Sequence, residues 1–252
     1  MAERNALPRA RGAPPAAELV LVAAALCGPG CNLTSVPTEI QEYHAMAQEL
    51  EPVVTAALEP GDILMRRGHF RILGGLIRYS DLLCHLCDSP FSHAGLAYER
   101  VGDDFLVLDI GPYGIQRRYL VDFLIEGPEN VVVLRLRPEF RDRLPRVMAM
   151  ARQLVENDVL HDFPYGSSEE DFYCAELVDH VYREAGLPLA DKVPIRELPN
   201  VRRWYQEWFY QVVAWIVGAD MSAPIAVTGN REYGMYASPY LMEVLNLMES
   251  AE

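Results

Sequence analysis

One cysteine of this sequence stands in a setting that suits nucleophilic chemistry. Cys174 lies in the segment DFYCAELV, at the predicted first turn of a helix. Unpaired backbone N–H groups and the positive end of the helix dipole stabilise a thiolate there, and they can also hold an oxyanion formed by attack on a carbonyl. The apolar residues that share a helical face with Cys174 indicate that the thiol points toward a sheet; they are Leu177, Val178, Val181 and Ala185.

A histidine and a carboxylate upstream could complete the catalytic group. A thiolate nucleophile needs an imidazole to take its proton, and the imidazole needs a polar partner to fix its tautomer. His93 begins the predicted strand in FSHAGLAYE, and Asp109 lies among strand-forming apolar residues in VLDI. On an antiparallel hairpin the two would lie at corresponding ends of adjacent strands, and the parity of the register decides whether they share a face. Glu99 is the alternative orienting residue, although it lies close to the predicted turn.

Each of these residues also has a purely structural interpretation. An isolated cysteine on an apolar helix face is often a core residue, and a histidine without context is often a satisfied core or loop residue. Cys84, His85 and Cys87 could form a metal site with His93. A single Cys-x-x-Cys is weak evidence for zinc, and Asp88 stands where a c-type haem motif needs histidine. The sequence therefore predicts no cofactor, and it favours a local disulfide or two packed thiols at Cys84 and Cys87.

The elements that must position these residues predict an α+β fold with an antiparallel sheet. Strand-forming runs lie at residues 63–65, 94–99, 105–110 and 131–137. Helical patterns lie at residues 38–58, 70–86, 139–157 and 172–185, with a short helix or turn at 119–125. Gly102-Asp103-Asp104 is typical of a hairpin turn, and Gly186 is typical of a helix C-terminal cap.

Length and composition restrict the class of protein. The chain has 252 residues, of which 50% are apolar, so one catalytic domain with a substantial core is expected. The formal net charge is −14, and no run of lysine and arginine interrupts it. Because binding to a phosphate backbone requires a basic surface, nucleic acid is not an expected partner.

The N-terminal residues resemble a secretory leader. Three arginines precede a short apolar stretch at 19–26, and Cys27 and Cys31 follow among small residues. Gly30-Cys31 fits the end of a bacterial lipoprotein signal better than Leu26-Cys27 does, so the chain is expected to be exported to the periplasm or anchored to the cell envelope through a lipidated Cys31. A disordered Ala/Pro-rich leader with two incidental cysteines is the alternative. The apolar stretch is too short for a stable membrane span.

Four segments taken together resemble a known family: GDILMRRG, FSHAGLAYE, VLDIGPYGI and FPYGSSEEDFYCAELVDHVYREAGL. They are similar to the circularly permuted branch of the NlpC-type cysteine hydrolases, the YiiX/YebB-like proteins related to lecithin retinol acyltransferase. The resemblance covers residues 60–187 and implies a permuted papain-like fold, with Cys174 as nucleophile, His93 as base and Asp109 as the polar third residue. It also suggests Tyr165 and Tyr173 as substrate-binding residues near the cleft.

The resulting interpretation divides the chain into a leader (1–31), a helical arm (32–59), a catalytic domain (60–190) and an aromatic-rich helical extension (191–252). The expected activity is cleavage of an amide or peptide bond through a thioacyl-enzyme intermediate. A lipid acyltransferase or esterase with the same site is the first alternative, because the aromatic residues between 201 and 217 could contact acyl chains as well as pack in the core. A non-catalytic envelope protein that binds peptide or lipid is the second.

Overall fold

The computed structural model describes residues 38–69, 71–72, 77–111, 114–157, 173–201, 211 and 220–248. Within these residues the main sheet has six strands in the order β10-β7-β1-β4-β5-β6, and all neighbours are antiparallel. The strands are β1 (Ile63–Arg66), β4 (His93–Val101), β5 (Asp104–Gly111), β6 (Gly114–Tyr119), β7 (Val131–Leu136) and β10 (Leu241–Leu247). Two short ribbons pair β2 (Arg71–Ile72) with β3 (Ile77–Arg78), and β8 (Val193–Pro194) with β9 (Pro224–Ile225).

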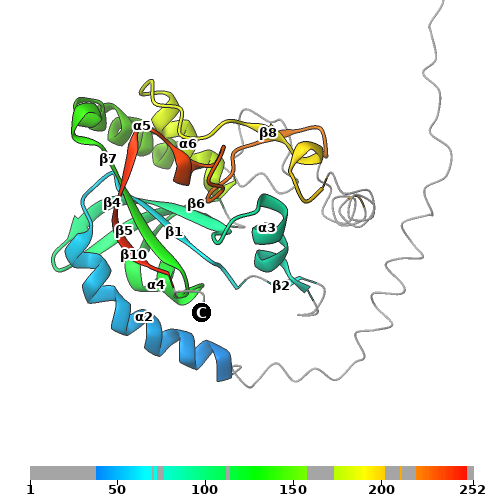
Figure 1. The fold of residues 1–252 in the computed structure, drawn as a ribbon. Coiled ribbons are helices and arrows are strands. Elements are labelled where there is room, and N and C mark those ends of the chain that lie inside the picture. The colour runs from blue at the N-terminus through cyan, green and yellow to red at the C-terminus, as the bar shows by residue number, and fades with distance from the viewer. Residues whose placement is uncertain are drawn as a thin grey trace, which may run out of the picture.

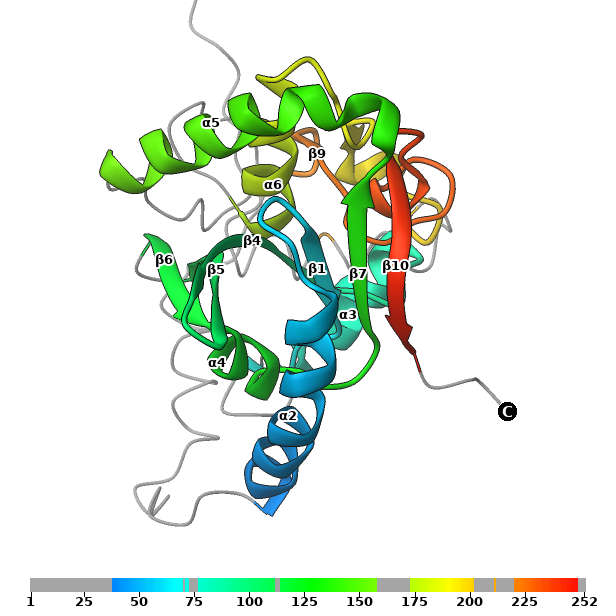
Figure 2. The ribbon, with the colours of Figure 1, turned by 90° about the vertical axis from the view of Figure 1, so that its left-hand side faces the viewer.

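Helices cover both faces of this sheet, with α5 and α6 on one side and α2 and α4 on the other (Figures 1 and 2). The α-helices are α2 (Thr38–Ala57), α3 (Tyr79–Cys87), α4 (Leu120–Ile125), α5 (Leu144–Glu156) and α6 (Cys174–Arg183). Short 3₁₀ turns are η2 (Pro138–Arg143), η3 (Ile195–Glu197) and η4 (Met235–Ala237). The predicted α+β class with an antiparallel sheet is therefore confirmed.

Alternation along the strands divides the core into two layers. On β1, Ile63 and Met65 belong to the cluster under α5 and α6, whereas Leu64 belongs to the cluster under α2 and α4. Strand β7, with its run of β-branched residues, is buried on both faces, as a strand in the middle of a covered sheet must be. Because each fully buried aliphatic side chain contributes about 1.5–3 kcal/mol, this double layer is the main stabilising feature of the domain.

The hairpin of β4 and β5 brings the predicted histidine and aspartate strands together. Val101 pairs with Asp104, so Gly102 and Asp103 form a two-residue turn. Gly102 has φ +64°, which suits the first central position of a type II′ turn. Between Ala97 and Glu99 the pairing with β5 shifts by one residue, so Tyr98 forms a bulge.

Helix α6 ends as its sequence predicts. Gly186 has φ +83°, and the N–H of Leu187 donates to the carbonyl of Tyr182 at 3.0 Å, which together make a Schellman cap. The buried face of the helix carries Leu177, Val178 and Val181, as expected. This packing fixes the first turn of α6 against the sheet.

Two predicted helices differ from the structure. Among the described residues of the stretch 70–86, residues 71–72 and 77–78 form the β2–β3 ribbon and the helix begins at Tyr79; Gly74 and Gly75 lower the helix propensity of the first half. The predicted helix 139–157 is split into η2 and α5, because Pro145 lacks an N–H and suits the first turn of a new helix. Strands β6 and β10 were not predicted, since their sequences GIQRRY and LMEVLNL lack a strong strand pattern.

Several sequence predictions lie outside the described residues: the leader 1–31 with Cys31, Tyr165, and most of the aromatic segment 201–217. Among the residues that are described, no helix is both long enough and apolar enough to cross a membrane.

Candidate active site

The thiol of Cys174 lies at the N-terminus of α6. Its preceding residue, Tyr173, is extended with φ −105° and ψ 172°, and the side chain of this N-cap residue makes no capping hydrogen bond. The N–H groups of the first turn, at the positive end of the helix dipole, lie beside the sulfur. Cys174 is partly buried, and its Sγ lies 4.0 Å from the carbonyl oxygen of Ser92. This contact brings α6 against the residue that precedes His93.

His93 is held by Asp109. The Nε2 atom of His93 lies 2.7 Å from Oδ1 of Asp109, which is only 2% exposed. Because an ionised carboxylate only accepts hydrogen bonds, Nε2 carries the proton and Nδ1 is left for the thiol of Cys174. The same carboxylate accepts the N–H of Ile110 at 2.7 Å and Nη1 of Arg118 at 3.2 Å. These contacts fix the orientation of the Asp109 carboxylate and, through it, of the imidazole.

The charges of these groups favour an ion pair. Burial raises the pKa of Cys174, but the charge and hydrogen bond of His93 and the N–H of Ala94 outweigh it and lower that pKa below its ordinary value. Burial also lowers the pKa of His93, yet the Asp109 and Cys174 charges overcome it and raise the pKa to about 9. Despite its burial, Asp109 has a pKa of about 2, because His93 stabilises the carboxylate. The lowered thiol pKa and the raised imidazole pKa both favour the thiolate–imidazolium form over the neutral pair.

A second layer of charges supports Asp109 from behind. Nη1 of Arg118 lies 2.8 Å from Oε1 of Glu126, and Nη2 of Arg66 lies 3.0 Å from Oε2 of the same carboxylate. Arg66 is 2% exposed, pairs with His93 in the sheet register, and stacks its guanidinium 4.5 Å from the ring centroid of Phe123. Glu126 therefore compensates two cations that would otherwise compete for Asp109.

The other two described cysteines have a different character. Cys84 and Cys87 are buried free thiols near the end of α3. Burial raises the pKa of Cys84 to about 11 and that of Cys87 to about 12, so both are protonated at neutral pH. In the described residues, no group of three or more histidines, cysteines or acids is arranged to hold a metal ion. The sequence favoured either a local disulfide or two packed thiols at Cys84 and Cys87. In the structure the two residues are packed as free thiols.

The structure brings Cys174, His93 and Asp109 together, as the sequence predicts. Glu99, the alternative orienting residue, pairs with Leu106 beyond the bulge and is not the residue that contacts His93. Tyr173 is 5% exposed, and its hydroxyl bonds to the backbone of Ala226, so a role in substrate binding stays a prediction. Arg118 and Glu126 escaped sequence reasoning, because strand β6, which carries Arg118 toward Asp109, was itself not predicted.

Comparisons with known proteins concern the family and the fold of the chain. The family described as permuted papain-like amidase enzyme, YaeF/YiiX, C92 family, matches residues 57–196, which is more than half of the chain. A solved structure described as the metalloprotein yiiX from Escherichia coli O157:H7 shares the fold with a TM-score of 0.58 at 17% identity, covering 76% of this chain and 98% of that one. No curated protein matches the chain in sequence.

Proposed function

Because this chain belongs to the family of permuted papain-like amidases, and is thus an enzyme of the cysteine hydrolase class, we propose that it cleaves an amide or peptide bond with Cys174 as nucleophile. In this proposal His93 is the base and Asp109 orients it. The observation that carries the proposal is the 2.7 Å contact between His93 Nε2 and Asp109, which leaves Nδ1 as the ring nitrogen for the thiol at the helix N-terminus.

The first half of the reaction forms a thioester. The Cys174 thiolate attacks the substrate carbonyl carbon, and the negative charge moves to the carbonyl oxygen. Backbone N–H groups of the first turn of α6 are suited to stabilise that oxyanion, because they lie at the positive end of the helix dipole beside Cys174. Collapse of the tetrahedral intermediate breaks the C–N bond, and imidazolium His93 gives its proton to the departing amine.

The second half of the reaction releases the acid. Neutral His93 takes a proton from a water molecule, whose oxygen attacks the thioester carbonyl. The C–S bond then breaks and the thiolate and imidazolium pair is restored. Amide and water thus become acid and amine, and Asp109 stays ionised throughout while it stabilises imidazolium His93.

Two further predictions from the sequence belong to this proposal. The first is an ester or lipid substrate, which would be cleaved by the same chemistry with an alcohol as leaving group. This alternative is based on the aromatic residues between 201 and 217, most of which lie outside the described residues. Export to the cell envelope, with a lipidated Cys31, rests on the leader sequence alone.

Thiol labelling and hydrolysis assays test the proposal together. Iodoacetamide at pH 7 should alkylate Cys174 faster than Cys84 by about tenfold or more, as followed by peptide mass spectrometry, because the pKa of Cys174 is lowered whereas that of Cys84 is raised. A panel of fluorogenic N-acyl amino acid amides and matching esters then identifies the bond that is cleaved. The variant Cys174→Ala should abolish turnover, whereas Cys84→Ala, as matched control, should retain it. Full turnover in Cys174→Ala would refute the assignment.

A further inference from the structure

The segment 226–230 lies against both parts of the candidate site. At the nucleophile, the hydroxyl of Tyr173 donates to the carbonyl of Ala226 at 3.1 Å and accepts the N–H of the same residue. Tyr173 directly precedes Cys174 and is the N-cap residue of α6. The position of the first turn of α6 is therefore tied to the backbone of Ala226.

The same segment binds the loop that leads into His93. Oγ1 of Thr228 donates to the carbonyl of Phe91 at 3.0 Å, and Nδ2 of Asn230 donates to the carbonyl of Cys87 at 3.1 Å. Phe91 is completely buried and stands two residues before His93. Two side chains thus connect the segment to the short chain between α3 and β4.

Gly229 makes this approach unusually close. A β-carbon at this position would lie 2.3 Å from Oγ of Ser89 and 2.4 Å from Cδ2 of Phe91. Real β-carbons do not approach other atoms so closely, so any side chain would displace the loop. Only glycine at position 229 lets the backbone of the segment pack directly on the loop that leads into His93.

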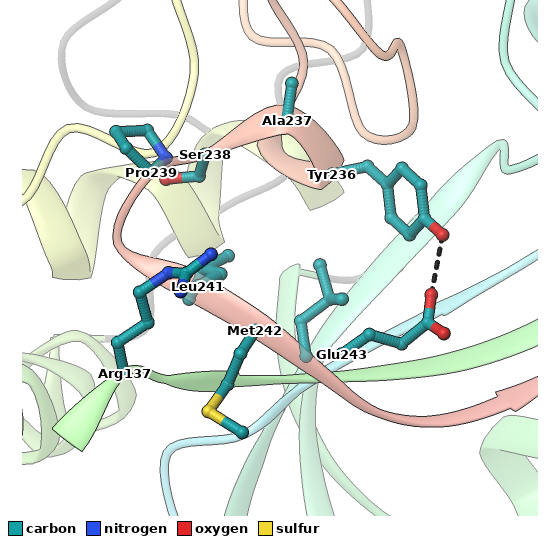
Figure 3. Close-up of a pocket in the computed structure, with 9 residues that line it drawn as sticks. Arg137, Tyr236, Ala237, Ser238, Pro239, Leu241, Met242 and Glu243 are labelled. Carbon is teal, nitrogen blue, oxygen red and sulfur yellow. Dashed lines mark hydrogen bonds between the residues drawn. The ribbon is translucent and has the colours of Figure 1, made fainter.

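The segment is in turn anchored to the sheet. The N–H of Met235 donates to the carbonyl of Val227 at 2.9 Å, and the N–H of Tyr236 donates to the carbonyl of Thr228 at 3.0 Å. The ring of Tyr236 lies 5.6 Å from that of Phe91, and its hydroxyl donates to Glu243 on β10 at 2.6 Å (Figure 3). Because β10 pairs with β7 along its length, the segment has a rigid base.

We propose that residues 226–230, which we name the clamp, set the separation between Cys174 and His93, and that Tyr173 and Thr228 are its positioning residues. The inference rests on the proposed function. The nucleophile and the base come from elements far apart in sequence. Tyr173, next to the nucleophile, and Phe91, two residues before the base, are both bonded to the same five-residue segment, which lies beyond the family-matched residues 57–196. A misplacement of about 1 Å between reacting groups can cost about a hundredfold in rate, so a dedicated spacer has a clear use.

The test compares two clamp variants with a matched control. Tyr173→Phe removes the hydroxyl that bonds to Ala226 of the clamp, and Thr228→Val removes the hydroxyl by which the clamp bonds to Phe91. Thr228→Ser retains a hydroxyl at position 228. Tyr182→Phe removes an equivalent buried hydroxyl from the other end of α6, where Tyr182 donates to the carbonyl of Gly61. The readout is the pH profile of Cys174 alkylation by iodoacetamide in the full chain, which needs no substrate, together with kcat and KM once a substrate is known.

The clamp predicts that Tyr173→Phe and Thr228→Val raise the apparent pKa of the Cys174 thiol, so that the alkylation profile moves by about one pH unit to higher pH. In both variants kcat should fall with KM unchanged, while Thr228→Ser and Tyr182→Phe keep the wild-type profile. Two results would overturn the proposed role of the clamp and leave the proposed function standing. One is a reactive wild-type Cys174 whose alkylation profile is the same in Tyr173→Phe and Thr228→Val. The other is a shift of that profile in Tyr182→Phe as large as in those two variants. A wild-type Cys174 no more reactive than Cys84 would overturn the proposed function, and the clamp with it.

Discussion

His93 and Asp109 lie on the same face of the sheet because a single extra residue interrupts the pairing of their strands. From the turn to Glu99, the pairing of β4 with β5 follows one register, and beyond the bulged Tyr98 it follows another, in which Leu96 pairs with Leu108. Continuing the first register to Asp109 would place the carboxylate on the face opposite His93, since side chains alternate along a strand. The bulge reverses that parity and creates the 2.7 Å contact.

Replacing Asp109 by asparagine should reduce kcat/KM by about 10²–10⁴-fold. Loss of the carboxylate removes the charge that raises the pKa of His93 and permits the wrong tautomer, as in a serine triad without its aspartate. The variant Asp103→Asn, in the exposed turn of the same hairpin, is the control. Steady-state kinetics and Cys174 alkylation measure both, and an Asp109→Asn enzyme with wild-type kcat/KM would exclude Asp109 as orienting residue.

The pH profile of kcat/KM should have an acidic and a basic limb. The acidic limb follows ionisation of Cys174, whose pKa is below its ordinary value, so activity rises before pH 9. The basic limb follows loss of the proton from His93, whose pKa is about 9, because the leaving amine needs that proton. Initial rates between pH 5 and pH 11 report both limbs. Activity that continues to rise through pH 10 would contradict the assignment of His93.

The His93–Asp109 pair should stabilise the fold most strongly at moderate pH. Because the pKa of His93 is raised from 6.5, its contribution is fully present below about pH 6.5 and is lost as pH rises toward 9. The test compares Cys174→Ala with Cys174→Ala/His93→Gln, so that the thiol does not titrate. In this background Asp109 alone raises the pKa of His93, so the upper end of the pH window lies below 9. The difference in urea unfolding free energy should shrink between pH 6 and pH 9, and a constant difference would refute the linkage.

Glu126→Ala should destabilise the fold by about 1–3 kcal/mol, because it leaves the buried guanidinium of Arg66 without its carboxylate. Glu59→Ala is a matched control: Glu59 is exposed to a similar extent, and its partner Arg135 keeps Asp62 at 2.6 Å. That control should cost less than about 1 kcal/mol. If urea unfolding gave the same loss of unfolding free energy for Glu126→Ala and Glu59→Ala, Glu126 would not compensate the charge of Arg66.

Gly95→Ala should destabilise the site from beneath by about 1–3 kcal/mol. A β-carbon at Gly95 would lie 2.7 Å from Val107 and 2.8 Å from Phe123, and the ring of Phe123 stands 5.6 Å from the His93 ring. The matched control is Gly68→Ala, where the nearest atom is a serine hydroxyl at 3.0 Å. Thermal unfolding of both variants measures the difference in stability. A Gly95→Ala variant as stable as Gly68→Ala would contradict the close packing around Gly95.

The sequence was informative wherever chemistry and local pattern coincide. Cys174 at the start of an amphipathic helix, His93 at the start of a strand and Gly186 at a helix end each have a local physical cause that can be recognised without a structure. The sequence could suggest that His93 pairs with Asp109, but it left the parity of their register open, because no sequence rule predicts a bulge at Tyr98.

Other parts of the site depend on contacts between distant residues. Strand β10 contains leucine, methionine, glutamate and asparagine, and it is extended because it pairs with β7 rather than because of its own propensity. Arg118 reaches Asp109 only through the pairing of β6 with β5. The sequence could not reveal either, since both are decided by tertiary packing.

Strand β10 and the residues that bond to Tyr173 and Phe91 follow both Cys174 and His93 in the chain, so they are synthesised after them. Until they emerge from the ribosome, the helix of Cys174 and the loop that leads into His93 lack their shared support, and β7 lacks its neighbour β10. In the proposed arrangement, the thiol of Cys174 is therefore aligned with His93 only after these later residues have packed against the sheet.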